Sequence, residues 1–328
     1  MRTLERLSYS GFSTWEGRPD EFYLKYLCER RSPRVPQEHP AAVGSAFDAI
    51  VKSNLHAALY GPDSDPKYEL AALYEAQVEP QNRDWAMPEG QHVFAAYQVS
   101  GFYDDLLSQL RASSAPPRFE FTVEAVLNGV PFTGKPDAGW VTPGLIHVVH
   151  DWKVNGYCGK GTTSPHKSYM LCKDGWIGKQ SKSHGTEHNA FLGRLHGDIT
   201  VNTSFLEAAN PAWADQLSLY AWAMGEPVGG ETVLSIHQIT AKTIPESRPQ
   251  LRVSAFRALV ANDYQLKLAE RIRRCWDAIT SGHVFLDLSR EDSDARCATL
   301  DGAAVGLQTD GSSAEDYFNE CARIRYMG

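Results

Sequence analysis

The sequence predicts an α/β fold with a layer of helices in its N-terminal part. Between residues 8 and 112, apolar residues recur at the spacing of a helix face. From Phe119 onward, runs rich in β-branched and aromatic residues are separated by turn residues, which is typical of strands. Pro116-Pro117 lies between the two patterns, so we expect the helical layer to end there.

The N-terminal part is expected to contain a series of amphipathic helices. Ser10 or Ser13 could cap the first of these, and Pro33 and Pro36 would end it. The second has an apolar face formed by Phe47, Ile50, Val51, Leu55 and Leu59. The expected helices span residues 8–31, 41–59, 68–77 and 91–112.

Strands joined by tight turns are expected after this helical layer. Asn128-Gly129 lies between two apolar runs and is a strong hairpin signal. Pro143-Gly144 marks a second turn. The expected strands cover residues 119–127, 130–140 and 145–154.

The C-terminal half mixes a poorly patterned segment with further regular elements. Residues 155–198 are rich in glycine, lysine and histidine with little periodicity, so we expect an insertion or a mobile loop. Asn210 should cap a helix that has Pro211 at its first position. We also expect strands at 198–205 and 232–240 and a long helix at 253–281.

Length and composition are compatible with one large domain. The chain has 328 residues, of which 42% are hydrophobic. We therefore expect a single domain with a helical part at 1–115, a core at 116–240 that contains the insertion 155–198, and a C-terminal helix and tail at 241–328. No apolar run is long enough to span a bilayer, and the N-terminus has no apolar signal core, so a soluble, cytoplasmic protein without a membrane partner is expected.

Charge and cysteine content exclude some classes of protein. The net charge of −8 argues against indiscriminate binding of polyanions. The six cysteines are scattered without a close pair, so a disulfide framework is not expected. They are Cys28, Cys158, Cys172, Cys275, Cys297 and Cys321.

Two aspartates and a lysine form the most informative pattern of the chain. Asp137 and Asp151 lie fourteen positions apart, across a hairpin that brings both to one edge of a sheet. Two hard oxygen donors placed together suit Mg²⁺ or Mn²⁺. Asp151 and Lys153 have equal parity on one strand, so both side chains point to the same face. A metal ion and an ammonium group there can activate water and neutralise charge that grows on a phosphate.

Pro136-Asp137 followed by Asp151-Trp152-Lys153 resembles the signature of the PD-(D/E)XK nuclease superfamily. Residues 8–27 resemble the N-terminal helix of its RecB-like and CRISPR-associated branch. Gly44 and Asp48 are similar to that branch's Gly-x-x-x-His motif, with Asp in place of His, and Gln216 and Tyr220 to its Gln-x-x-x-Tyr motif. The resemblance covers roughly residues 8–225.

The resemblance implies a restriction-endonuclease-like core, in which a central mixed sheet is flanked by helices. It also implies a metal-dependent DNA nuclease, of exonuclease type, in recombination, repair, or phage or CRISPR DNA processing. Asp137, Asp151 and the main-chain carbonyl of Trp152 would hold Mg²⁺ or Mn²⁺, and Lys153 would orient the attacking water. Partners would be DNA and, on a separate chain, a recombinase, helicase or single-strand-annealing protein.

Further residues have roles that the sequence leaves open. Asp48 would be a third metal ligand, or else an ordinary polar helix residue. Glu124 would contact the metal ligands without binding the metal itself, or it would simply lie in the sheet. Gln216 and Tyr220 share a helix face and would hold a phosphate or orient Lys153, although Tyr220 could equally be a core residue.

The segment after Lys153 combines lysines with aromatic residues. It contains Lys160, Lys167, Lys173, Lys179 and Lys182, with Tyr157, Tyr169 and Trp176 between them. By composition this pattern fits a solvated loop, but its position directly after Lys153 favours a loop that binds a nucleic-acid strand, with Lys160, Lys167 and Lys173 as substrate-binding residues.

Metal and function alternatives remain. The histidines and cysteines of the insertion could bind zinc, but their spacings match no compact pattern. No iron–sulfur cluster is expected, because Cys275, Cys297 and Cys321 lack the tight spacing of cluster ligands. A nucleic-acid-binding protein without turnover, or a nuclease that acts on RNA, would carry much the same pattern.

Overall fold

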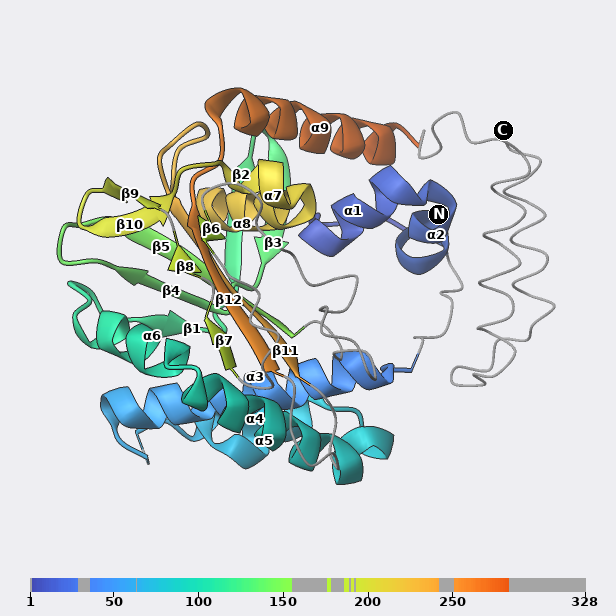
Figure 1. The fold of residues 1–328 in the computed structure, drawn as a ribbon. Coiled ribbons are helices and arrows are strands. Elements are labelled where there is room, and N and C mark those ends of the chain that lie inside the picture. The colour runs from blue at the N-terminus through green and yellow to red at the C-terminus, as the bar shows by residue number, and fades with distance from the viewer. Residues whose placement is uncertain are drawn as a thin grey trace.

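The computed structural model describes residues 2–28, 36–62, 64–154, 193–241 and 251–282, together with short pieces at 176–177, 186–188 and 190–191. Within this part of the chain, a mixed sheet of six strands lies between layers of helices (Figure 1). The expected central mixed sheet flanked by helices is therefore confirmed. No described helix is both long and apolar enough to span a membrane.

The strand order of the sheet is β1-β4-β5-β11-β12-β7. Neighbouring strands are antiparallel except for two parallel pairs, β5 with β11 and β12 with β7. The strands are β1 (Arg118–Phe119), β4 (Ala138–Val141), β5 (His147–Val154), β11 (Val233–Ala241), β12 (Leu251–Ala258) and β7 (Thr186–His188). The carboxyl end of β5 carries the residues of the sequence motif. The helices that pack beside this end therefore form the surroundings of those residues.

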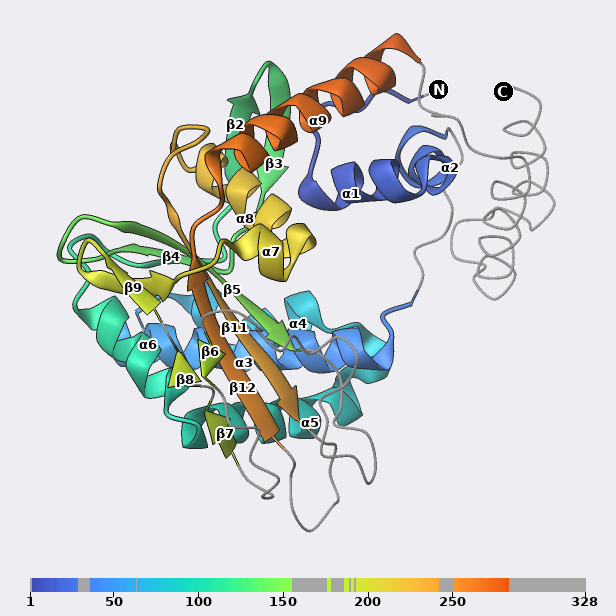
Figure 2. The ribbon, with the colours of Figure 1, turned by 45° about the horizontal axis from the view of Figure 1, so that its top comes forward.

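One face of the sheet is covered by the helices of the middle of the N-terminal part (Figure 2). Phe47 and Tyr97 from these helices pack with Val148 and Trp152 of β5 in one apolar core. The helices are α3 (His39–Tyr60), α4 (Leu70–Gln77), α5 (Arg83–Val99) and α6 (Phe102–Arg111).

The other face is covered by the two ends of the described chain together with a hairpin (Figure 2). Phe12, Phe132, Leu217 and Ile272 meet Val149 of β5 in a second apolar core. The elements are α1 (Tyr9–Gly17), α2 (Pro19–Phe22), the hairpin β2 (Val123–Leu127) and β3 (Val130–Gly134), α7 (Leu206–Ala209), α8 (Pro211–Ala223) and α9 (Asn262–Ser281).

Several local predictions are confirmed. Asn128 and Gly129 both have positive φ, of 47° and 76°, and join β2 to β3 as a tight turn. Asn210 caps α8 by accepting a hydrogen bond from the backbone N–H of Trp213 at 3.2 Å, with Pro211 in the first turn. Helix α3 and strand β11 nearly match the expected residues 41–59 and 232–240.

Two expected helices are broken. The first ends at Gly17, restarts at Pro19, and closes in a π-helical turn at Tyr23–Leu27. Pro19 has no N–H to continue the first helix, and Ser8, rather than Ser10 or Ser13, caps it. The helix expected at 91–112 begins earlier, at Arg83, and is interrupted at Gly101, whose φ of 82° is left-handed.

Predicted strands are also divided. The chain bends at Glu120, so residues 119–127 belong to β1 and β2 in different sheets. Pro136 cannot donate to a strand ladder, and residues 130–140 split into β3 and β4 on either side of it.

The helix expected at 253–281 is wrong in its first part. Residues 251–258 form β12, which pairs antiparallel with the whole length of β11, and helix α9 begins only at Asn262. In the segment expected to be a loop at 155–198, the described pieces are strands: β6 (Trp176–Ile177), β7, β8 (Ala190–Phe191) and β9 (Gly193–His196). Strand β9 pairs with β10 (Ile199–Asn202), the strand expected at 198–205.

Candidate active site

The hairpin of β4 and β5 brings the two motif aspartates together. Ala138 pairs with His150, and the same antiparallel register places Asp137 opposite Asp151. Asp137 Oδ2 accepts a hydrogen bond from the backbone N–H of Trp152 at 3.0 Å. The two carboxyl groups are close enough to influence each other's ionisation. The sheet edge therefore presents paired oxygen donors, as the motif predicts.

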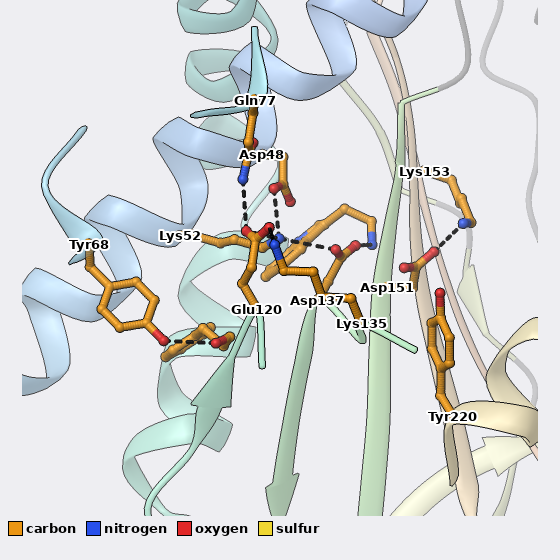
Figure 3. Close-up of polar contacts among 12 residues, drawn as sticks. Asp48, Lys52, Tyr68, Gln77, Glu120, Lys135, Asp137, Asp151, Lys153 and Tyr220 are labelled. Carbon is orange, nitrogen blue, oxygen red and sulfur yellow. Dashed lines mark hydrogen bonds and ion pairs between the residues drawn. The ribbon is translucent and has the colours of Figure 1, made fainter. Parts of the chain in front are cut away.

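Lys153 lies on the same side of β5 as Asp151, with which it forms an ion pair. Its Nζ also donates to Gln216 Oε1 at 2.9 Å, and Gln216 Nε2 donates to the hydroxyl of Tyr220 at 3.2 Å. The pair on α8 thus holds the lysine. In Figure 3 the Tyr220 hydroxyl points toward Asp151.

Gly134 leaves the space that the Tyr220 ring occupies. A Cβ at residue 134 would lie 2.7 Å from that ring, closer than real contacts allow. Tyr220 is also buried among the apolar residues beneath α8. The ring of Tyr220 thus packs in the core, as one interpretation expects, while its hydroxyl accepts from Gln216; a role toward phosphate or Lys153 stays a prediction.

Helix α3 adds an aspartate and a lysine that lie one turn apart. Asp48 and Lys52 form an ion pair in which Lys52 Nζ is 2.6 Å from Asp48 Oδ2. The same Nζ lies 3.1 Å from Asp137 Oδ1 and 2.9 Å from Glu120 Oε2 (Figure 3). Lys52 is 1% exposed, so these carboxylates supply its surroundings in place of water.

Glu120 reaches this cluster from the bend after β1. Its φ of 43° is in the left-handed region, which costs a non-glycine residue of the order of 1 kcal/mol or more and is common at functional sites. Its backbone N–H donates to the carbonyl of Asp137 at 3.0 Å. Its carboxylate accepts from Gln77 at 2.7 Å and pairs with Lys135 at 2.5 Å.

Of the two roles left open for Glu124, the structure shows the place in a sheet. Glu124 lies on β2, in the separate hairpin sheet, and its carboxylate pairs with Arg6 at 3.1 Å. The bend at Glu120 turns the chain out of the main sheet before Glu124 is reached. The acidic residue that reaches the cleft from this part of the chain is Glu120.

Sequence reasoning missed Lys52, Glu120 and Gln77. The spacing of Asp48 and Lys52, four residues apart on a helix, was a signal that both share a face. Glu120 directly follows an apolar strand end, but nothing local distinguishes it from Glu124. Gln77 ends α4 and has no sequence signal at all.

A cleft of about 410 Å³ joins these groups. Gly44, Asp48 and Lys52 line it from α3, and Asp151, Trp152 and Lys153 from the end of β5. Its wall also contains Glu120, Asp137 and Gln77. The site residues expected on α3, at Asp137 and on β5 thus share one cleft, with Gln216 and Tyr220 adjoining Lys153.

The electrostatics of the carboxylates are uneven. Burial raises the pKa of Asp151 to about 8 and that of Asp48 to about 7, since the charge of Asp137 adds to burial and outweighs the neighbouring lysines. Burial also acts on Asp137, but Lys52, the neighbouring Asp151 carboxyl and the hydrogen bond from the Trp152 N–H lower its pKa to about 2. The cleft therefore combines an ionised carboxylate at Asp137 with two carboxyl groups that a bound cation would help to ionise.

The donor chemistry fits a hard divalent cation at Asp137 and Asp151. Both offer carboxylate oxygens, the donors that Mg²⁺ and Mn²⁺ prefer. Among the described residues, no three His, Cys, Asp or Glu side chains come together as a ready-made metal site. The Lys52 and Lys153 ammonium groups lie against the carboxylates.

Several predicted residues lie outside the described part of the chain. Lys160, Lys167 and Lys173 lie outside the described residues, as do the histidines and cysteines considered for zinc, apart from His188, whose side chain is not described. Cys275 lies on the buried face of α9, while Cys297 and Cys321 fall outside the described residues. The expectation of no iron–sulfur cluster stays a prediction.

Comparisons with known proteins add little. No family model matches the chain, and no curated protein matches it. Among solved structures, it is similar to a protein from Eubacterium rectale that is provisionally named an exonuclease. The likeness has a TM-score of 0.43 at 12% identity, over 87% of this chain and 89% of that one. So distant a likeness carries no argument about chemistry.

Proposed function

We propose that this chain is a metal-dependent nuclease of the PD-(D/E)XK superfamily that hydrolyses phosphodiester bonds of DNA. One observation carries the proposal: Asp137 lies opposite Asp151, and the Lys153 ammonium pairs with Asp151 at the same cleft. Paired carboxylates with an adjacent ammonium provide both a cation site and a positive charge for a phosphate.

Each residue of the cleft has a role in this proposal. Asp137, Asp151 and the main-chain carbonyl of Trp152 would hold Mg²⁺ or Mn²⁺. A bound divalent ion supplies a water of lowered pKa and polarises a phosphate oxygen. Lys153, held by Gln216, would place its ammonium against the negative charge of the phosphate and the attacking water.

The narrower assignment to the RecB-like and CRISPR-associated exonuclease branch rests on motif order. Gly44 and Asp48 line the cleft, and Gln216 contacts the lysine, so the motifs that resemble this branch surround one site. We propose DNA as the substrate on this ground, with any recombinase, helicase or annealing protein on a separate chain.

A second candidate is a nucleic-acid-binding protein without turnover. The observation that favours it is Lys52, a buried cation that already pairs with Asp48, Glu120 and Asp137. If that ammonium excluded every divalent ion, the cleft would bind a strand without cutting it.

The test is digestion of end-labelled single-stranded DNA, double-stranded DNA and RNA, with Mg²⁺, Mn²⁺ or a chelator. We expect cleavage of DNA with either ion, none with chelator, and none by Asp151→Asn. Cleavage of RNA alone would identify an RNA nuclease. Binding of DNA without cleavage in the presence of either Mg²⁺ or Mn²⁺ would favour the second candidate. Activity that survives Asp151→Asn would overturn the assignment of a metal-dependent nuclease.

A further inference from the structure

Lys52 is the buried charge whose role the proposed reaction leaves unexplained. It enters the cleft from α3, and its ammonium contacts one oxygen each of Asp48, Glu120 and Asp137, at 2.6, 2.9 and 3.1 Å. An ammonium group has three N–H donors, so these contacts use all of them. The lysine is therefore fully committed to the carboxylates.

Three carboxylate oxygens surround this ammonium, in the way that oxygen ligands surround a metal ion. Oxygen ligands lie about 2.0–2.6 Å from Mg²⁺, Mn²⁺ or Ca²⁺. A metal ion held by the same three oxygens would nearly coincide with the Lys52 nitrogen, and both centres are positively charged. The two cannot be present together.

Asp137 separates Lys52 from the other end of the cleft. Its Oδ1 faces Lys52, whereas its Oδ2 accepts from the backbone of Trp152, beside Asp151. In two-metal nucleases, ions about 3.5–4 Å apart commonly flank the reacting phosphate. Lys52 lies across Asp137 from the Asp151 side, where a second ion of such a pair would be.

We propose that Lys52 is a built-in cation that replaces a second metal ion, so that the site binds one divalent ion, at Asp137 and Asp151. Asp48 and Glu120 are then partners of Lys52 and not metal ligands. Lys52 acts as a positioning residue, because it holds the Asp137 carboxylate through Oδ1, the oxygen that faces away from Trp152. This inference rests on the proposed metal-dependent function.

The surroundings of Glu120 support a fixed ammonium site. Its backbone is held in the left-handed region, and Gln77 donates to the same Oε2 that faces Lys52, at 2.7 Å. A carboxylate that also accepts from a neutral amide is oriented toward the lysine before any ion arrives. Asp48 contributes the third oxygen from one helical turn away.

The experiment is a titration of the purified protein with Mn²⁺, read as the number of ions bound and by electron paramagnetic resonance. We expect one ion and an uncoupled Mn²⁺ spectrum for the wild type. Lys52→Met should bind two ions with a spin-coupled spectrum. Lys135→Met is the matched control, because Lys135 pairs with the same Glu120 but is 56% exposed, and it should bind one ion.

The number of bound ions can overturn the inference. Two ions in the wild type would show that Lys52 does not take the second position, and this measurement needs no variant to fold. One ion in a folded Lys52→Met protein would do the same. No ion in the wild type would instead remove the proposed metal-dependent function and the inference with it.

A second pair of variants asks which aspartate is a ligand. Asp151→Asn should lose Mn²⁺ binding, whereas Asp48→Asn should keep one bound ion. If Asp48→Asn lost the ion as completely as Asp151→Asn, Asp48 would be a ligand and the inference would fall.

Discussion

The ammonium of Lys153 is held from two sides, by Asp151 on its own strand and by Gln216 on α8. Such a position, close to a carboxylate pair in a cleft, makes Asp151 and Lys153 the residues whose loss should be most costly to the chemistry.

Asp151→Asn and Lys153→Met should each lower DNA cleavage by at least about a hundredfold, as removal of a charge-stabilising group commonly does. The pKa of Asp151 is raised to about 8, so this carboxyl lowers stability as pH rises from the unfolded-state pKa of about 3.9 to about 8, and the loss is complete above that. Asp151→Asn should therefore melt no lower than the wild type at about pH 9. For the cleavage assay of Lys153→Met, the control for loss of a positive charge is Lys267→Met, at an exposed lysine of α9.

Gln216 and Tyr220 should differ in their effects on activity. Gln216→Met removes an acceptor of a charged donor, an interaction of about 1.5–3 kcal/mol, so we expect a loss of about ten- to hundredfold. Tyr220→Phe removes only a neutral hydrogen bond and keeps the ring in place, which should cost about fivefold. An equal loss in both variants, measured as initial cleavage rates, would mean that the Tyr220 hydroxyl contacts substrate directly.

At the scale of elements, the position of the site depends on how α3 packs. Gly44 belongs to the sequence motif, but a Cβ there would meet only Val154, at 3.9 Å. The close approach lies elsewhere, at Gly90 of α5, where a Cβ would be 2.6 Å from Ala46 Cβ and 3.0 Å from the backbone of Phe47. Gly90 therefore lets α5 lie directly against the helix that carries Asp48 and Lys52.

Gly90→Ala should accordingly destabilise the protein by about 1–3 kcal/mol, since neither helix backbone can move away without disturbing the core. Gly44→Ala is the matched control in the same helix pair, and it should be neutral or stabilise by about 0.5–1 kcal/mol through helix propensity. Urea unfolding of both variants measures the difference. A Gly90→Ala protein as stable as Gly44→Ala would contradict the packing shown here.

At the scale of the whole molecule, the sheet buries neutral histidines between its helical layers. His237 of β11 is 1% exposed, and its Nδ1 is 2.6 Å from the hydroxyl of Tyr97 on α5. His150 of β5 lies next to it, with ring centroids 4.7 Å apart. Burial, with the neighbouring His150 and Arg257, lowers the pKa of His237 well below its usual value.

A histidine with a lowered pKa in the folded state stabilises the protein above its unfolded pKa of about 6.5, and that contribution is lost as pH falls. The wild type should therefore lose up to about 1.4 kcal/mol per pH unit, relative to His237→Gln, below about pH 6.5. The comparison with the variant cancels the titration of Asp48 and Asp151, whose raised pKa values act in the opposite direction. Urea unfolding of both proteins from pH 7 to pH 4 measures this difference in the free energy of unfolding. If the free energies of the two proteins changed in parallel with pH, His237 would not be a buried histidine with a lowered pKa.

The sequence by itself determined the features that depend on neighbours in the chain. The turn at Asn128-Gly129, the cap at Asn210 and the hairpin that aligns Asp137 with Asp151 are set by backbone preferences and by the parity of a strand. These were enough to predict the α/β fold and the centre of the candidate site.

Only the tertiary structure decided which other charges meet at that centre. Lys52 reaches Glu120 and Asp137 over 68 and 85 residues of chain, and no local pattern distinguishes Glu120 from Glu124. Residues 251–258 became a strand because β11 offers a full backbone ladder to pair with. The physical reason is common to these cases: desolvation and strand pairing depend on what lies across the fold, and a sequence window contains only what lies along the chain.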